Sequence, residues 1–252
     1  MNVLLLRFDG LLMSFGGVMV DHHGPTERFP GLSLLTGLFS NALGYRHTDF
    51  EAIESLQSRI EFGARWDIEP EPIEDYHTVD LARPKMIGYA DIKKKAEHGG
   101  WTTRGMPEHR AGGNKARYGT HIRRRHYWAD GVMTVAAALL GHEKPDTLDL
   151  ETALNRPARP LFLGRKACLP SGPILIGGVE AQDVLMALRL APRCTRPGRA
   201  AVGTEMEACW PARLGVEKGA RMVTVYDRRD WTNQVHTGSR LRAEGRIREV
   251  ET

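Results

Sequence analysis

An apolar run near the N-terminus leads through a turn into a helix rich in small residues. Residues 3–8 are almost continuously apolar, which predicts a short strand covered by helices. Leucines at helical spacing between residues 31 and 44 predict a helix whose apolar side packs on a sheet. The other side is predicted to be low and polar, because it carries Ser33, Thr36, Gly37 and Ser40. Free N–H groups at such a helix start favour a phosphate, and tight packing of small residues is the alternative interpretation.

The same periodicities predict the remaining elements. Helices are expected at residues 50–56, 148–154 and 181–190, and strands at 59–66, 126–139 and 222–226. Asp146 or Thr147 can cap the second of these helices. Regular structure is predicted to stop at the Glu-Pro-Glu-Pro run of residues 69–72. Residues 157–173 contain four prolines and are predicted to wrap the domain rather than extend a sheet.

Composition narrows the class of protein. The 252 residues, 41% of them hydrophobic, suit one domain with a large excursion or two small domains. No apolar run approaches the roughly 18 residues that cross a bilayer. Three cysteines, Cys168, Cys194 and Cys209, show no metal-like spacing, which favours reduced thiols in a cytoplasmic protein without structural zinc or disulfides.

Charge is distributed in two adjacent blocks of opposite sign. Residues 48–82 hold ten acidic residues against two arginines, and residues 83–128 hold twelve lysines and arginines against three acids. This pattern predicts two different surfaces, one that repels phosphate and one that attracts it. Residues 85–117 also contain six glycines and few large apolar residues, which predicts an extended hairpin or partly disordered excursion that becomes ordered on a partner.

The basic block interleaves cations with aromatic side chains, as single-stranded nucleic-acid sites do. Its cations can neutralise phosphates without reading bases, and stacking contributes about 1 to 3 kcal/mol per base. A solvated basic hairpin is the alternative, and duplex DNA is a competing partner. The residues concerned include Lys93, Lys94, Lys95, Arg123, Arg124 and Arg125, with Trp101, Tyr118, Tyr127 and Trp128 among them.

Several short motifs resemble one family and occur in its order. They are Arg-Phe-Pro-Gly and Leu-Leu-Thr-Gly-Leu within residues 28–38, Asp-Tyr-His-Thr-Val at 75–79, Arg-His-Tyr-Trp-Ala-Asp-Gly at 125–131, and Arg-Pro-Leu-Phe-Leu-Gly-Arg-Lys-Ala-Cys at 159–168. Tyr-Asp-Arg-Arg at 226–229 is a weaker fifth match. In these residues the chain resembles the CasD subunits of Cascade, the type I-E CRISPR surveillance complex, within the RAMP superfamily.

The resemblance implies an α+β fold: a ferredoxin-like (RRM-like) RAMP domain with an antiparallel sheet, a protruding thumb hairpin and a small C-terminal region. On this basis residues 1–82 and 118–180 would form the RAMP domain, residues 83–117 the thumb-like excursion, and residues 181–252 the C-terminal region. The family implies a non-catalytic subunit without cofactor or metal, which holds the 5′ handle of the crRNA and caps the backbone filament. Its partners would be the crRNA, a CasC-type backbone subunit, a large CasA-type subunit and, through the complex, target DNA, but no membrane.

The resemblance also implies which residues hold the handle. They are Ser14, Gly16 and Gly17 in the first loop, Arg28 and Ser33 at the helix start, Tyr76, His77 and Thr78 before the excursion, and Arg165 and Lys166 after the proline-rich run. Arg28 is the strongest of these, because a guanidinium at a helix entry can hold a phosphate by two hydrogen bonds. A salt bridge to Glu27 or a neighbouring acid is the alternative role for it.

Two other functions remain open on the residues alone. Histidines near cations, such as His77 and His121, are what a metal-independent endoribonuclease that processes crRNA precursors would need. Related type I-C subunits cleave with tyrosine, lysine and histidine, but this basic region lacks an adjacent Lys-His pair. A general single-strand binder unrelated to CRISPR is the other possibility.

Overall fold

The computed structural model describes residues 1–17, 19, 22–80, 100–101, 107–108, 120–199 and 203–250. The chain divides into two compact units. The first comprises Met1–Gly16, Thr26–Ile73 and Tyr127–Thr252, and the second comprises Gly17–Pro25 and Glu74–His126. Lys93, Lys94 and Lys95, with most of the predicted excursion at 83–117, lie outside the described residues.

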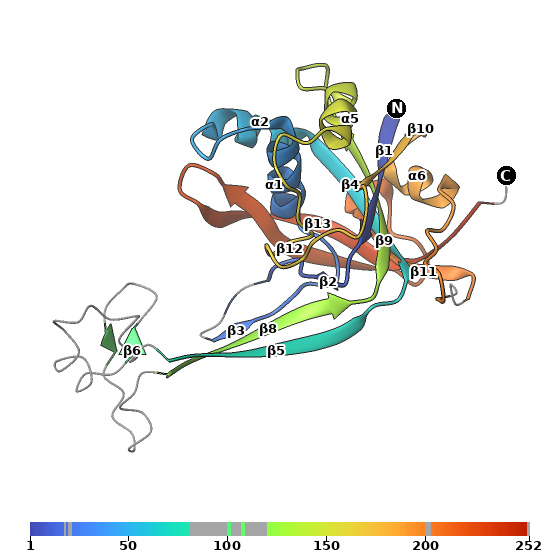
Figure 1. The fold of residues 1–252 in the computed structure, drawn as a ribbon. Helices are drawn as coiled ribbons and strands as arrows, with labels where there is room; N and C mark the ends of the chain where they lie inside the picture. The colour runs from blue at the N-terminus through green and yellow to red at the C-terminus, as the bar shows by residue number, and fades with distance from the viewer. Residues whose placement is uncertain are drawn as a thin grey trace. The chain divides into compact units, whose positions relative to one another are not determined.

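A seven-stranded antiparallel sheet forms the centre of the first unit (Figure 1). Its spatial order is β10-β1-β9-β4-β11-β13-β12. The strands are β1 (Asn2–Asp9), β4 (Ile60–Ile68), β9 (Val132–Leu139), β10 (Leu175–Glu180), β11 (Glu205–Pro211), β12 (Arg221–Asp230) and β13 (Val235–Arg248). The predicted strand at residues 3–8 is confirmed, and β9 is central because β1 and β4 pair with its two edges.

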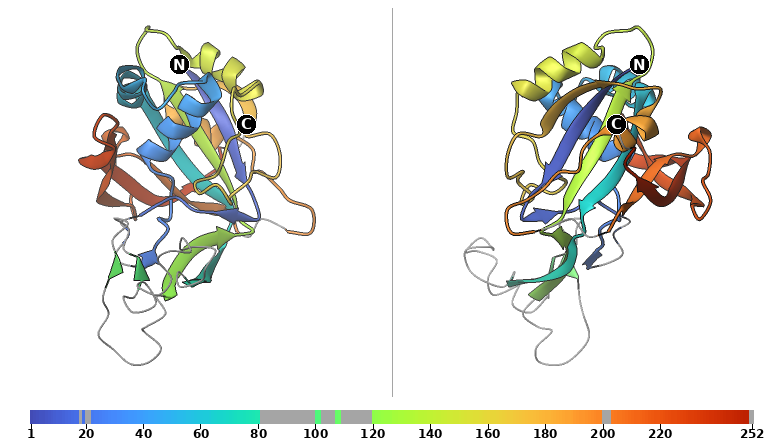
Figure 2. Two further views of the ribbon diagram at one scale, coloured as in Figure 1. Left: turned by 60° about the vertical axis from the view of Figure 1, so that its left-hand side comes forward. Right: turned by 90° about the vertical axis from the view of Figure 1, so that its right-hand side faces the viewer.

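Four helices of the described chain cover both faces of this sheet (Figure 2). They are α1 (Leu32–Leu43), α2 (Phe50–Arg59), α5 (Thr147–Asn155) and α6 (Val184–Leu190), and a single 3₁₀ turn, η2 (Ala212–Leu214), follows β11. Alternation along β1 divides the core: Leu4, Leu6 and Phe8 pack in one cluster with α1, α2 and α5, whereas Val3 and Leu5 pack in the other with α6.

In a smaller sheet, β8 (Thr120–Ala129) pairs with three other strands. β2 (Leu12–Met13) pairs antiparallel and β3 (His23–Gly24) pairs parallel with β8, and β5 (Glu71–Asp80) also pairs with it. Two described two-residue strands, β6 (Gly100–Trp101) and β7 (Pro107–Glu108), pair with each other. The side chains of Thr78, Trp101 and His121 are not described.

The predicted helix at 31–44 is confirmed, but its polar side is not exposed. α1 ends at Gly44, whose φ of 83° suits a residue without a side chain. Thr36 and Ser40 are buried, and Thr36 Oγ1 donates a hydrogen bond to the Leu32 carbonyl at 2.8 Å. The interpretation that small residues allow tight packing is therefore the one the structure favours, because α5 also packs on this helix.

Several sequence expectations about element boundaries are wrong, each for a local reason. Regular structure does stop after Ile68, where β4 ends, but it resumes at Glu71 rather than after Pro72. An edge strand tolerates Pro72, because β5 pairs only with β8 among the described strands. The single strand predicted at 126–139 is two, β8 and β9, separated at Asp130, which has φ 55°. α6 begins later than predicted, because the Asp183 carboxylate caps it by accepting from Met186 N–H at 2.8 Å.

The C-terminal residues 181–252 add both a helix and three strands to the main unit. α6 packs against β9 and β4, and β11 pairs with β4 through Ala208 and Cys209. Residues 238–248, a strongly basic stretch for which no strand was predicted, belong to the 14-residue strand β13. Two of its arginines are paired with carboxylates within the sheet, Arg242 with Glu244 at 2.5 Å and Arg240 with Asp227 at 2.8 Å.

Candidate nucleic-acid interface

The start of α1, where a phosphate was expected, is occupied by the chain's own carboxylate. Leu32 N–H donates to Asp227 Oδ2 at 2.9 Å, and Arg240 Nη2 lies 2.8 Å from the same oxygen. Asp227 comes from β12, so a segment far along the chain supplies the negative charge that a helix N-terminus favours. Ser33, in the first turn, is partly buried.

Arg28 is held within the protein by two carboxylates and two indole rings. Its Nε donates to Glu207 Oε2 at 2.9 Å, and its Nη2 also pairs with Glu69. The guanidinium carbon lies 5.0 Å from the Trp66 ring centre and 4.9 Å from that of Trp128. Arg28 therefore forms salt bridges within the protein, which was its alternative role, and its partners are Glu207 and Glu69 rather than Glu27.

In the first loop the two predicted glycines are exposed to solvent, whereas the predicted serine is buried. Gly16 and Gly17 are exposed, with φ of 82° and 139°, so both adopt the left-handed region that favours glycine. Ser14 is buried, and its backbone N–H donates to the Leu163 carbonyl at 3.1 Å. A Cβ on Gly164 would lie 1.6 Å from the Ser14 carbonyl oxygen, so the proline-rich segment closes directly over this residue.

Strands β5 and β8 bring two predicted motifs together in the second unit. Tyr76 is 53% exposed, and the Arg124 guanidinium lies 5.8 Å from its ring centre. Glu74 links the two strands, since one of its oxygens lies 3.2 Å from Arg124 Nη1 and the other 3.5 Å from His126 Nε2. We call Glu74, Tyr76, Arg124 and His126 the ribbon cluster. An exposed ring beside a guanidinium is suited to stacking on an unpaired base.

The other predicted residues on these strands flank the ribbon cluster. The His77 imidazole lies against the Asp75 carboxylate. Arg123 and Arg125 are the neighbours of Arg124 on β8, and Arg125 is exposed. On the far side of β8, the His22 carbonyl accepts from Arg124 N–H at 2.9 Å, and the rings of His22 and His23 are 4.3 Å apart.

Arg165 and Lys166 lie in a tight turn of the proline-rich segment in the first unit. The turn is closed by hydrogen bonds of 2.8 Å from Cys168 N–H to the Arg165 carbonyl and from Leu163 N–H to the Cys168 carbonyl. Arg165 lies over Tyr127, 4.9 Å from its ring centre. Lys166 is exposed, so it is the member of this pair that faces solvent.

Part of the acidic block pairs with arginines. Glu69 and Glu71 pair with Arg28 and Arg199 in the first unit, and Glu74 pairs with Arg124 in the second. The strand that carries much of the acidic block, β5, also pairs directly with the basic strand β8. Most of the basic block lies outside the described residues, so the expectation of two surfaces of opposite sign stays a prediction. Glu74 is a site residue that sequence reasoning missed.

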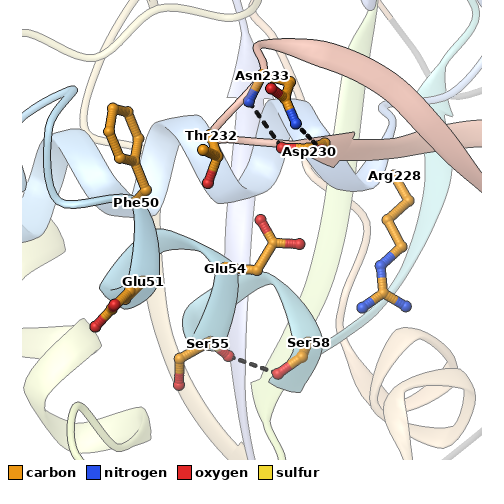
Figure 3. Close-up of a pocket in the computed structure, with 9 residues that line it drawn as sticks. All are labelled: Phe50, Glu51, Glu54, Ser55, Ser58, Arg228, Asp230, Thr232 and Asn233. Carbon is orange, nitrogen blue, oxygen red and sulfur yellow. Dashed lines mark hydrogen bonds between the residues drawn. The ribbon is translucent and has the colours of Figure 1, made fainter.

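A cleft of about 650 Å³ in the first unit lies between α2 and the end of β12 (Figure 3). It is lined by Glu51, Glu54 and Asp230, with Arg228 as its cation. Asp230 accepts hydrogen bonds of 2.8 Å from the backbone and side chain of Asn233, which lower the pKa of its carboxyl. Three carboxylates against one guanidinium disfavour a phosphate, so this cleft is not part of the candidate interface.

Among the described residues no group of three or more His, Cys, Asp or Glu side chains could hold a metal ion. No described helix is both long and apolar enough to span a membrane.

Comparison with known proteins decides the family. The model of a family described as CRISPR-associated protein (Cas_Cas5) matches residues 3–243. The chain belongs to the Cas5 family. A curated Cas5-type relative, the CRISPR system Cascade subunit CasD of Escherichia coli (strain K12), is 28% identical over 195 residues, which cover 74% of this chain and 75% of the relative.

Solved structures support the fold of this Cas5 chain. One, described as a CRISPR RNA-guided surveillance complex, is 23% identical with a TM-score of 0.65, covering 98% of this chain and 90% of the other. A second, described as a Cas protein, is 20% identical with a TM-score of 0.60, covering 98% and 95%. The chain is thus a mixed α+β protein with a large antiparallel sheet, like known Cas proteins.

Proposed function

We propose that this Cas5-family chain is a non-catalytic RNA-binding subunit of a type I-E Cascade particle. In this role it holds the 5′ handle of the crRNA, caps the filament of CasC-type backbone subunits and contacts a large CasA-type subunit. The relative named as a Cascade subunit and the structural neighbour from an RNA-guided complex support this role.

The fold is consistent with an RNA-recognition domain. The order β10-β1-β9-β4 is antiparallel throughout, with α1 and α2 between β1 and β4 and with α5 between β9 and β10. This order supports the proposal of a ferredoxin-like domain, whose arrangement is βαββαβ. β11, β13 and β12 extend its sheet beyond β4.

The observation that carries the proposal is the ribbon cluster. It places a half-exposed aromatic ring, Tyr76, beside a cation, Arg124, on adjacent strands. RNA single strands are bound by this combination, because the ring stacks on a base while the cation neutralises phosphate. The start of α1 contributes less than the sequence suggested, since Asp227 already occupies it.

The test is the affinity for an RNA that begins with the repeat-derived 5′ handle, measured by filter binding against a scrambled RNA of equal length. The wild-type chain is expected to prefer the handle, and Tyr76→Ala is expected to weaken handle binding about tenfold, which corresponds to one lost stacking contact. Ile73→Ala is the matched control, because Ile73 is a 43% exposed apolar residue on the opposite face of the same strand. Equal affinity for handle and scrambled RNA would contradict the proposal.

A further inference from the structure

The carboxylate of Glu74 is held beside the aromatic ring that is proposed to stack on RNA. Glu74 and Tyr76 are two residues apart on β5, so their side chains leave the same face of the strand. Arg124 contacts both, because its Nη1 lies 3.2 Å from Glu74 Oε1 and its guanidinium carbon lies 5.8 Å from the Tyr76 ring centre. The other carboxylate oxygen, Oε2, lies 3.5 Å from His126 Nε2. Two contacts therefore orient this carboxylate.

The same carboxylate keeps hydrogen-bonding capacity toward solvent. The Glu74 side chain is 38% exposed. Its two oxygens offer about four lone-pair positions, and the contacts with Arg124 and His126 engage one on each oxygen. An ionised carboxylate only accepts hydrogen bonds, so a ligand group that meets it must donate. A phosphate is therefore repelled, whereas the N–H groups on the edge of a base are attracted.

We infer that Glu74 is a specificity-determining residue, which reads the Watson–Crick edge of the base stacked on Tyr76 and favours guanine. Guanine carries two adjacent donors on this edge, N1–H and the N2 amino group, so it matches the two oxygens of one carboxylate. Adenine and cytosine place a donor beside an acceptor instead. A guanidinium has five N–H donors, so Arg124 can contact the phosphate while it holds Glu74. The inference rests on the proposed function in one respect, namely that an unpaired RNA base stacks on Tyr76.

The test measures the affinity of the full chain, by fluorescence anisotropy, for short oligouridines that carry one central guanosine, inosine or adenosine. Inosine lacks the N2 amino group, so it removes one donor of guanine. Glu74→Gln replaces an accepting oxygen by a donating amide, which matches the donor and acceptor of adenine instead. Glu71→Gln is the matched control, because it makes the same change on the same strand, where the carboxylate pairs with Arg199 at 2.6 Å in the first unit. Thermal melting verifies that both variants are folded.

Wild type and Glu71→Gln are expected to bind the guanosine probe about fivefold more tightly than the inosine probe, the effect of one solvent-exposed hydrogen bond. Glu74→Gln is expected to lose this difference and to bind the adenosine probe most tightly. The inference is overturned if wild type binds the guanosine probe no more tightly than the other two, or binds none of them. It is also overturned if Glu74→Gln keeps the wild-type order of affinities, since Glu74 would then only orient Arg124. Equal wild-type affinity for handle and scrambled RNA, with the guanosine preference retained, would contradict the proposed function instead.

Discussion

The sequence suggests Arg28 as a phosphate ligand, but in the structure its side chain makes contacts that stabilise the fold. Its guanidinium lies against the rings of Trp66 and Trp128, and Trp128 Nε1 donates to the Glu27 carbonyl at 2.7 Å. A lysine cannot reproduce a guanidinium that contacts two rings and pairs with two carboxylates at once. Arg28 therefore joins the turn before α1 to strands β4 and β8.

Replacing Arg28 by alanine is expected to lower the free energy of unfolding by about 2 kcal/mol, because two cation–π contacts and the hydrogen bond to Glu207 are lost. Urea denaturation measures the change. Arg156→Ala, which removes an exposed arginine, is expected to have little effect. If Arg28→Ala keeps full stability but loses RNA affinity, Arg28 contacts RNA and its internal pairing is secondary.

The three thiols are predicted to differ in reactivity. Burial raises the pKa of Cys209 to about 11 and also raises the pKa of Cys168 and Cys194. Because the thiolate is the reactive form, the native chain at pH 8 is expected to react with a disulfide reagent at Cys194 first, as Cys194 is only partly buried. Mass spectrometry locates the modified thiol, and fast labelling of Cys209 in the native protein would contradict the packing of β11.

At the scale of single residues, the sequence indicates which side chains could bind RNA, but not which side chains contact one another. It identifies Tyr76 and Arg124 as RNA candidates, and the structure brings their side chains together. Glu74, Glu207 and Asp227 could not be found in this way, because each acts on a residue distant in sequence. Only the weak match at residues 226–229 drew attention to the neighbourhood of Asp227.

At the scale of secondary-structure elements, the paired strands β5 and β8 carry the proposed RNA-binding residues. They lead to a prediction about how RNA affinity depends on salt. If Arg124 neutralises one phosphate, Arg124→Ala is expected to weaken handle binding and to reduce the slope of log K against log salt by about 0.7, the value for one contact on a single strand. Filter binding at several salt concentrations measures the slope. Arg156→Ala serves again as control, and an unchanged slope for Arg124→Ala would mean that Glu74 keeps this guanidinium from RNA.

Element types were predicted well where periodicity is strong and poorly where charge dominates. The helices at 32–43, 50–59 and 147–155 follow from the helical spacing of apolar residues, and the capping box of Asp146 and Asp149 confirms the expected start of α5. The long strand β13 was missed although Leu241, Ala243 and Ile247 alternate with arginines, a period-two pattern that indicates a strand. The pairing of two of these arginines with Asp227 and Glu244 depends on tertiary structure, which local sequence cannot reveal.

For the whole molecule, the family and its mixed α+β class could be predicted from short motifs, whereas the electrostatic arrangement could not. Charge blocks along the chain predicted separate surfaces, but strand pairing places the acidic β5 beside the basic β8. Lysines 93–95, which carry part of the basic block, lie outside the described residues, so their assignment to RNA stays a prediction.

The absence of a nuclease function is a prediction about the whole chain. Incubation of the purified protein with precursor crRNA in EDTA is expected to leave the RNA intact on a denaturing gel. The reason is that the basic region lacks an adjacent Lys-His pair, in which the histidine could take up a proton and the lysine could stabilise charge on the phosphate. A single discrete cut that His77→Ala or His121→Ala abolishes would establish the endoribonuclease instead.

Ultraviolet cross-linking of the purified particle, followed by mass spectrometry of the RNA–peptide conjugates, addresses the handle-binding role most directly. We expect the first nucleotides of the crRNA to cross-link to peptides that contain Tyr76 and Arg124, and we expect Tyr76→Ala to remove the first of these conjugates. Cross-links from those nucleotides to other subunits alone, with this chain free of RNA, would contradict the account.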